Sequence, residues 1–170
     1  MRMGDYFLKS ERLGFRRWAA ADMELAWELF GDPAVSKFVG GPFTREAVRQ
    51  TIQNHMAWQE GHGVQYWPMF TLEGGEFAGC CGLKPRPEPG AYELGFYLKP
   101  ACQGKGYATE AARAVAGYAF GTLKVKELYA GHHPQNAASR GTLAKAGFVY
   151  LREELYPPTG LLHPLYRLLP

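Results

Sequence analysis

The sequence predicts one α/β domain of the α+β type, in which a mixed, mostly antiparallel sheet of about seven strands carries four helices. The chain has 170 residues, enough for one domain and too few for two full-sized ones. No repeat, linker or low-complexity tract divides residues 1–170. The spacing of apolar residues changes between helical and alternating along the chain, which gives the order strand, two helices, three strands, helix, strand, helix, two strands.

The first elements are a strand and two helices. Residues 12–18 predict a first strand, and Asp22 then offers an N-cap for a helix that ends near Gly31-Asp32-Pro33. Thr44 is the candidate N-cap of a second, amphipathic helix, which is expected to end at Gly61.

Three strands follow, because the apolar period shortens from helical spacing to alternation. Residues 64–72 and 77–83 flank Gly74-Gly75 and predict a hairpin. The Pro- and Gly-rich residues 85–90 predict a loop before a third strand at residues 91–98.

The C-terminal half alternates helices and strands. Residues 108–123 are rich in alanine and predict a helix, and residues 127–131 predict a short strand. A helix at 137–146 ends before Gly147. Strands at residues 148–156 and 161–168 close the chain.

The composition excludes several classes of protein. Apolar residues make up 46% and charged residues 21%, which excludes general disorder. The formal charge of +3 is small and evenly spread, so a small anionic ligand is expected rather than nucleic acid. Three cysteines, Cys80, Cys81 and Cys102, lack disulfide and zinc spacing and are expected to be free thiols, with no metal site. Residues 1–10 lack a signal-peptide core and no stretch is apolar enough to span a membrane, so a cytoplasmic protein without a membrane partner is expected.

A glycine-rich turn joins the predicted strand 91–98 to the helix that follows it. Gly104 and Gly106 allow backbone N–H groups to converge, and the N-terminus of the helix adds partial positive charge. This pattern suits a phosphate or pyrophosphate, although two glycines alone do not distinguish it from an ordinary loop. A P-loop is excluded because Lys105 is followed by Gly106 and not by Ser or Thr. A dinucleotide fingerprint is excluded because Thr109 stands where the third glycine should be.

The same segment resembles a known family. Gln103-x-x-Gly106-x-Ala108 is similar to the Gln/Arg-x-x-Gly-x-Gly/Ala signature of the GNAT superfamily of N-acetyltransferases, and other segments resemble its RimJ/RimL-type branch. The resemblance runs from about residue 10 to the last strands. The segments that carry it are Glu11-Arg12-Leu13, Asp32-Pro33-Ala34-Val35, Gly104-Lys105-Gly106-Tyr107-Ala108-Thr109-Glu110-Ala111, Asn136-x-x-Ser139 and Lys145-Ala146-Gly147-Phe148.

The resemblance implies acetyl-CoA as co-substrate, a primary amine as acceptor, and a V-shaped opening between the fourth strand, 91–98, and the fifth, 127–131. The backbone of the fourth strand would bind the pantetheine arm, and the amides of the glycine-rich turn would bind the pyrophosphate. The residues assigned to coenzyme binding in this way are Phe96, Tyr97, Leu98, Gln103, Gly104, Lys105, Gly106, Tyr107, Ala108, Asn136 and Ser139.

Two residues are candidates for the chemistry. Glu93 matches the Glu-x-Gly-Tyr/Phe run of this branch and could accept the ammonium proton through a water, or it could simply face solvent. Ser139 lies one helical turn after Asn136 and could hydrogen-bond or protonate the departing thiolate, or it could be an ordinary first-turn serine. Asn136 could equally be a helix N-cap. Many GNAT enzymes have a tyrosine acid where this chain has Leu143, so Ser139 or water must supply that proton, or the tyrosine-type mechanism is absent.

His132 and His133 are adjacent on an extended segment and point to opposite faces, which makes them a poor metal site, and a structural role is expected. The leading hypothesis is an N-acetyltransferase in which the amine attacks acetyl-CoA directly, because no cysteine lies beside an evident base. The acceptor is a protein N-terminus or a small-molecule amine. The alternative is a non-catalytic acyl-CoA-binding sensor or scaffold. Whether the chain forms a homodimer is left open.

Overall fold

The computed structural model describes residues 5–170. Met1–Gly4 lie outside that range, and with them the first part of the segment that is expected to lack a signal-peptide core. Eight strands form one sheet in the order β1-β2-β3-β4-β5-β6-β8-β7. The strands are β1 (Leu8–Lys9), β2 (Leu13–Phe15), β3 (Tyr66–Thr71), β4 (Phe77–Pro85), β5 (Ala91–Leu98), β6 (Glu127–Gly131), β7 (Val149–Tyr156) and β8 (Leu161–Leu168). The helices are α1 (Met23–Phe30), α2 (Pro33–Ser36), α3 (Arg45–His62), α4 (Tyr107–Gly121) and α5 (Ala137–Lys145), with short 3₁₀ turns at Ala20–Asp22 and Pro100–Cys102.

The predicted fold class is confirmed, and the seven strands and four helices expected from the sequence are all present. Two short elements were not predicted. The strand β1 has only two residues and pairs with β2, and the helix α2 is a single turn. The turn of α2 is favoured by Pro33 at its first position and by Asp32, whose carboxylate accepts a hydrogen bond from the Ala34 N–H at 2.8 Å.

Three predictions about the N-terminal elements were wrong in detail. Asp22 precedes α1 but does not cap it, because its carboxylate accepts from the Ala19 N–H and pairs with Arg16. The strand predicted at residues 12–18 ends at Phe15, since the chain turns so that the Trp18 indole can donate to the Tyr66 carbonyl. The helix that Thr44 caps continues past Gly61 and ends at Gly63, which adopts the left-handed conformation (φ 70°).

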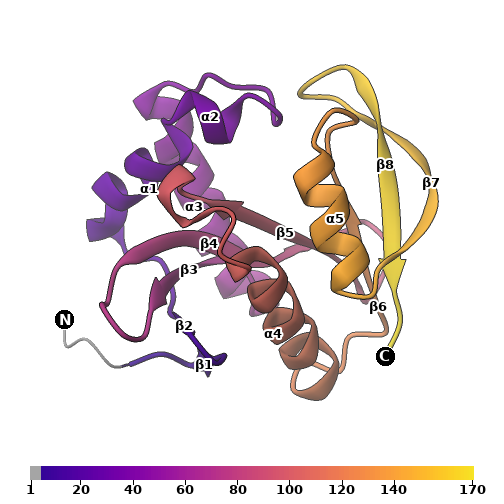
Figure 1. Cartoon of the computed structure of the whole chain (residues 1–170), viewed down its shortest axis with the longest axis horizontal. Helices are drawn as coiled ribbons and strands as arrows, with labels where there is room; N and C mark the ends of the chain where they lie inside the picture. Colours follow the sequence, from indigo (N-terminus) through magenta and orange to yellow (C-terminus); the bar gives the residue numbers. More distant parts are fainter. Residues whose placement is uncertain (1–4) are drawn as a thin grey trace.

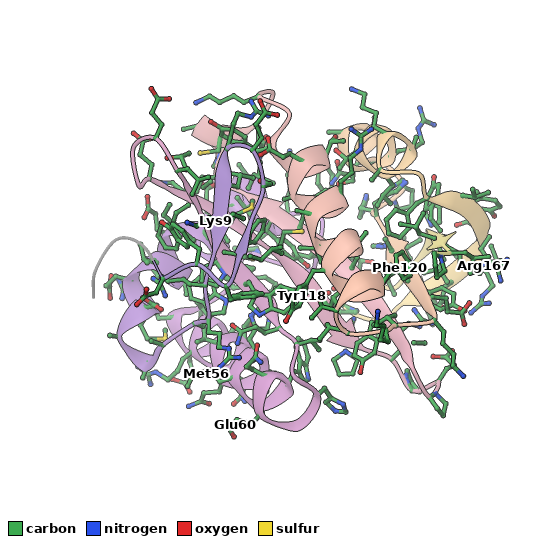
Figure 2. The ribbon with its side chains drawn as sticks, turned by 90° about the horizontal axis from the view of Figure 1, so that it is seen from below. Lys9, Met56, Glu60, Tyr118, Phe120 and Arg167 are labelled. Atoms are coloured by element: carbon green, nitrogen blue, oxygen red, sulfur yellow. The ribbon has the colours of Figure 1, made fainter. Side chains whose placement is uncertain are left out.

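The sheet separates two groups of buried side chains. On one face the alanine-rich helix α4 packs against β4 and β5, and the small side chains that it buries let it lie close to the strands. On the other face α1 and α3 cover residues of β3 and β4. Figure 2 shows Tyr118 of α4 near the middle of the molecule, Met56 and Glu60 of α3 on one side, and Arg167 of β8 at the far edge.

The strands β5 and β6 separate partway along their length. They pair in parallel only through Ala91–Glu93 and Glu127–Tyr129, after which β5 continues to Leu98 beside β4 while β6 turns to β8. The molecule therefore has an N-terminal arm (β1–β5 with α1–α4) and a C-terminal arm (β6–β8 with α5), with an opening between them (Figure 1). The V-shaped opening expected between 91–98 and 127–131 is confirmed. Among the helices of residues 5–170, none has the length and apolar character that crossing a membrane requires.

Candidate active site

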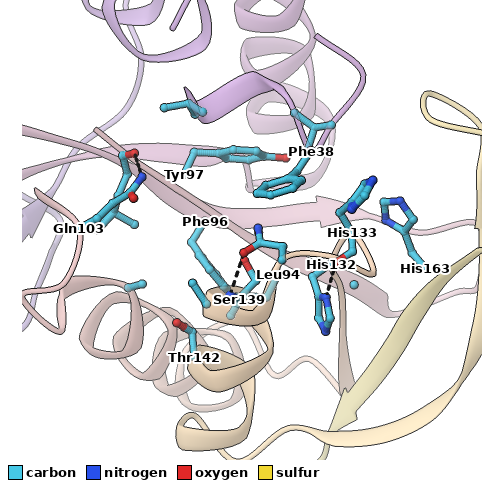
Figure 3. A pocket seen from close by; sticks show the side chains of 18 of the residues that line it. Phe38, Leu94, Phe96, Tyr97, Gln103, His132, His133, Ser139, Thr142 and His163 are labelled. Carbon is cyan, nitrogen blue, oxygen red and sulfur yellow. Dashed lines mark hydrogen bonds between the residues drawn. The ribbon is translucent and has the colours of Figure 1, made fainter. Parts of the chain in front are cut away.

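A cavity of about 500 Å³ lies in the opening between the two arms. Gln103 lies at one end, Phe96, Ser139 and Thr142 lie along the middle, and His133 and His163 lie at the other end (Figure 3). The loop that contains Gly40 lies against the β7–β8 turn, since a Cβ added at Gly40 would be 2.9 Å from the Pro158 carbonyl oxygen. Every predicted site residue lines this cavity except Lys105.

The glycine loop (residues 103–108) forms the first end of the cavity. Gly104 and Gly106 have φ angles of 74° and 82°, in the left-handed region that favours glycine. Gly106 is the N-cap of α4 and has no side chain to satisfy the first N–H groups of the helix, so these groups remain available to an external acceptor. An anion fits this position, because free N–H groups and the helix dipole act in the same direction.

Arg12 and Glu110 hold the glycine loop against the N-terminal strands. The Arg12 guanidinium pairs with the Glu110 carboxylate at 2.7 Å, donates to the Lys105 carbonyl at 3.0 Å, and lies over the Tyr107 ring. Burial acts to raise the pKa of Glu110, but hydrogen bonds from Ser10 and Arg12 lower it overall, so the carboxylate is ionised at neutral pH. Lys105 itself contributes its carbonyl to this contact and lies outside the cavity lining.

The second half of β5 borders the cavity with an unpaired edge. Phe96, Tyr97 and Leu98 pair with β4 on one side only, because β6 has already turned away. Gly95 gives the ring of Tyr66 room to cross the strand, since a Cβ at Gly95 would be 2.7 Å from that ring. Tyr66 is buried and also lines the cavity.

The helix α5 contributes the opposite wall. Asn136 caps the helix, because its Oδ1 accepts a hydrogen bond from the Ser139 N–H at 3.1 Å, and it also lines the cavity. The Ser139 hydroxyl has no hydrogen-bond partner among the residues described and faces the cavity together with Thr142. Leu143 points the other way and is fully buried in the core. No proton donor can therefore come from position 143.

Glu93 lies where β5 and β6 part. Its Oε2 is 3.3 Å from Lys84 Nζ and 3.5 Å from an Arg86 nitrogen, and its side chain is 23% exposed. Arg86 also pairs with Glu88 and Glu154, so the carboxylates on this side of the cavity are compensated by cations. Glu93 is therefore a cavity-lining carboxylate in an ion-pair network, and not a residue that merely faces solvent.

Histidine and tyrosine side chains from three segments meet at the far end of the cavity. His132 is fully engaged, with Nδ1 2.8 Å from the His133 carbonyl and Nε2 3.2 Å from the Tyr166 hydroxyl, in keeping with the structural role expected. His133 lines the cavity, where its ring lies 5.0 Å from that of Phe38 and 5.4 Å from that of His163. His163 stacks on Tyr156 at 4.6 Å. Sequence reasoning missed His163 and Tyr156, because nothing in the pattern of β7 and β8 separates them from ordinary strand residues.

The three cysteines are free and buried, as predicted. Burial raises the pKa of Cys80 and of Cys81, so both thiols stay protonated at neutral pH and are poor nucleophiles. Cys102 is in the core that packs against α4. Within residues 5–170, no group of three or more His, Cys, Asp or Glu side chains has a geometry that could hold a metal ion.

Comparison with known proteins agrees with this geometry. A family model described as an acetyltransferase (GNAT) domain matches residues 12–149. The uncharacterized protein YkkB of Bacillus subtilis is 32% identical over 124 residues, which are 72% of each chain. An acetyltransferase structure from Agrobacterium tumefaciens is 29% identical, with a TM-score of 0.82 over 99% of both chains.

A fold likeness extends to RimL, the ribosomal L7/L12 alpha-N-protein acetyltransferase, solved in complex with coenzyme A. That structure is 17% identical to this chain, with a TM-score of 0.78 over 94% of this chain and 95% of the other. The family match, the splayed sheet and the glycine loop agree with one another. The chain belongs to the GNAT family of N-acetyltransferases, which are acetyl-CoA-dependent acyltransferases.

Proposed function

We propose that this protein transfers the acetyl group of acetyl-CoA to a primary amine by direct attack within a ternary complex. The observation that carries the proposal is the single continuous cavity between the arms, with an anion cradle at one end and titratable side chains at the other. A donor that is an anion at one end and a reactive thioester at the other matches this polarity.

In this proposal the pyrophosphate binds the amides of the glycine loop, from Gln103 to Ala108. The free edge of β5 at Phe96–Leu98 hydrogen-bonds the amides of the pantetheine arm, because its backbone groups have no strand partner on that side. Asn136 lies beside the pantetheine arm of the coenzyme while its side chain caps α5.

The reaction needs a neutral amine and a stabilised leaving thiolate. Ser139 donates its hydroxyl proton or a hydrogen bond to the departing sulfur. Glu93 orients the water through which the ammonium loses its proton. An acetyl-enzyme is not part of the proposal, because the thiols of Cys80 and Cys81 are buried and protonated.

The acceptor end is lined mainly by aromatic and apolar side chains, and its carboxylates are already ion-paired with Lys84 and Arg86. A polycation would therefore find little unbalanced negative charge here, whereas an amine attached to an apolar or peptide body would fit. We propose a protein N-terminus or a small monoamine as acceptor.

Thiol-release assays with acetyl-CoA test this function on three kinds of amine: short peptides with free N-termini, 2-phenylethylamine and spermidine. Acetylated product detected by mass spectrometry, with intersecting double-reciprocal plots, is the expected result. Parallel plots would indicate an acetyl-enzyme instead. Coenzyme binding by calorimetry without thiol release on any amine would favour the non-catalytic acyl-CoA-binding module.

A further inference from the structure

We propose that His163 is the group that accepts the proton of the acceptor ammonium, with Nδ1 as the accepting atom. This inference rests on the proposed acetyl transfer and assigns a residue to its proton-removal step. It comes from the hydrogen bonds around the three histidines at the far end of the cavity, which leave each imidazole in a different state.

The hydrogen bonds of Thr159 bear on which nitrogen of His163 carries the proton. The Thr159 hydroxyl donates to the Tyr156 carbonyl at 3.3 Å and accepts from the Leu161 N–H at 3.4 Å. The same oxygen lies 3.0 Å from His163 Nε2. In this proposal the single hydroxyl proton is assigned to the Tyr156 carbonyl, so that the hydroxyl accepts from Nε2–H. With this assignment the neutral imidazole of His163 carries its proton on Nε2 and a free lone pair on Nδ1.

That lone pair is open to the cavity. Among residues 5–170 no group hydrogen-bonds Nδ1 of His163, and the one buried side-chain nitrogen sealed off without a partner is His55 Nδ1. His163 lines the cavity, and Figure 3 shows its ring facing that of His133 at the acceptor end.

The other two histidines cannot take this role without losing a hydrogen bond. His132 donates from Nδ1 to the His133 carbonyl, so its Nε2 accepts from the Tyr166 hydroxyl. Nδ1 of His133 already accepts from the Gln135 N–H at 3.1 Å, so in its neutral form it presents an N–H, and not a lone pair, on Nε2.

The charges around His163 keep it unprotonated at neutral pH. Burial lowers its pKa, the neighbouring His133 and His132 lower it further, and Glu153 and Glu93 oppose this with smaller effects. The groups that face it are Glu93 on β5, His132 and His133 after β6, and Glu153, Glu154 and Tyr156 on β7. A neutral imidazole beside a carboxylate is suited to receive a proton from a cation, because the Glu93 charge stabilises the imidazolium that forms.

The proton balance closes without a further reagent. The ammonium loses one proton to His163 Nδ1, through the water that Glu93 orients, and becomes a nucleophilic amine. The nitrogen then bonds to the thioester carbon as the carbon–sulfur bond breaks. The second proton of the nitrogen goes to the thiolate, relayed by the Ser139 hydroxyl or passed directly while Ser139 hydrogen-bonds the sulfur, and the imidazolium returns its proton to solvent.

The test compares His163→Gln with His133→Gln, a matched change of the neighbouring cavity imidazole. With the most reactive amine among the N-terminal peptides and 2-phenylethylamine, we expect His163→Gln to lower kcat/KM by roughly 10² to 10⁴. The wild-type rate should fall below the pKa of His163 and be level above it. In His163→Gln the rate should instead keep rising with pH as the free amine accumulates. His133→Gln should keep the shape of the wild-type profile, displaced to higher pH because His133 no longer lowers the pKa of His163. Two profiles of the same shape for wild type and His163→Gln would overturn the assignment.

A second readout does not depend on turnover. Nitrogen-15 NMR of the wild-type protein, with the His163 signals assigned by their loss in His163→Gln, should show a neutral ring protonated on Nε2 at pH 7. A ring protonated on Nδ1, or on both nitrogens, would contradict the proposal. Failure of the proposed function is distinguishable, because it would leave wild type itself without coenzyme binding or thiol release. Thermal unfolding of each variant shows whether it is folded.

Discussion

The two arms of the molecule build their parts of the cavity from different atoms. The N-terminal arm offers mainly backbone: the left-handed glycine loop, the uncapped start of α4 and the unpaired edge of β5. The C-terminal arm offers mainly side chains: Ser139 on α5, His133 after β6, and His163 on β8. In the proposed function the backbone groups bind the coenzyme, which is common to every substrate pair, and the side chains set reactivity and acceptor choice.

The two arms also differ in the contacts that hold their cavity-lining groups in place. The glycine loop is held by contacts from far along the chain, through Arg12 and Glu110. His132 and His163 are held by side-chain contacts within the C-terminal arm, His132 by Tyr166 and His163 by Thr159. Damage to the first arm should therefore show as weaker coenzyme binding, and damage to the second as slower chemistry.

Glu93 stands at the junction of the arms and gives the largest expected effect. Glu93→Gln should lower turnover by roughly 10² to 10⁴, most strongly at low pH where more of the amine is protonated, while coenzyme affinity stays nearly constant. Glu88→Gln is the matched control, because Glu88 also pairs with Arg86 but does not line the cavity. A pH–rate profile of Glu93→Gln that overlays that of wild type would reduce Glu93 to an ion-pair partner.

Ser139 tests the leaving-group side of the C-terminal arm. Loss of one hydrogen bond to a charged sulfur costs about 1.5 to 3 kcal/mol, so Ser139→Ala should turn over roughly 10- to 150-fold more slowly with little change in coenzyme binding. Ser139→Thr retains a hydroxyl and should recover part of the rate. Wild-type turnover in Ser139→Ala, under conditions where chemistry limits the rate, would indicate that water protonates the thiolate.

Two buried imidazoles, one in each arm, should behave differently in acid. His55 is enclosed by Phe30, Trp58 and Tyr66, and burial lowers its pKa to about 3. Below pH 6.5 the unfolded chain binds a proton at this position that the folded chain excludes, so the free energy of unfolding falls as the pH falls. Between pH 7 and pH 5 this amounts to about 2 kcal/mol, on the order of a 25-fold change in the folding equilibrium.

Urea unfolding at pH 7 and pH 5 measures this effect. His55→Leu should lose less stability on acidification than wild type does, because no proton can bind at that position. His163→Gln should alter the pH dependence of the free energy of unfolding less than His55→Leu does. His163 lines the cavity, so the folded protein excludes a proton from its ring less strongly than from the enclosed ring of His55. An equal loss of stability in wild type and in His55→Leu would contradict the role given to His55.

The glycine loop gives a binding effect in the N-terminal arm. Gly106 has a φ of 82°, where a β-branched residue is strained, so Gly106→Val should weaken acetyl-CoA binding at least tenfold, or by about 1.4 kcal/mol. Gly117→Val changes an exposed glycine of the same helix and serves as control. An unchanged dissociation constant in folded Gly106→Val, measured by calorimetry, would exclude this loop as the coenzyme site.

The smallest effect is expected from the contact that holds the loop. Arg12→Gln removes the ion pair with Glu110 and weakens the contact with the Lys105 carbonyl, both partly exposed to solvent. The dissociation constant of acetyl-CoA should rise by a few-fold, in line with the modest strength of exposed ion pairs. Arg49→Gln, which breaks the surface pair with Glu46, should leave it unchanged. An equal change in both variants would mean that the net charge of the protein, and not the contact of Arg12 with Glu110 and Lys105, sets the affinity for acetyl-CoA.

The sequence by itself determined the features that depend on local conformation. The switch from helical to alternating spacing defined seven strands and four helices, and the positions of Gly104 and Gly106 marked the loop where positive φ angles occur. Residues close together in sequence, such as Asn136 and Ser139, were also placed correctly on one wall, because helical spacing relates them directly.

Only the tertiary structure decided which distant side chains share the cavity. Glu93, His133 and His163 lie on β5, after β6 and on β8, and they meet because β5 and β6 part and β8 lies between β6 and β7. The state of His132 depends likewise on a partner that the packing of distant segments supplies, the Tyr166 hydroxyl of β8. A period-two pattern shows which face a residue occupies, but the order of strands in a sheet comes from the packing of the whole chain.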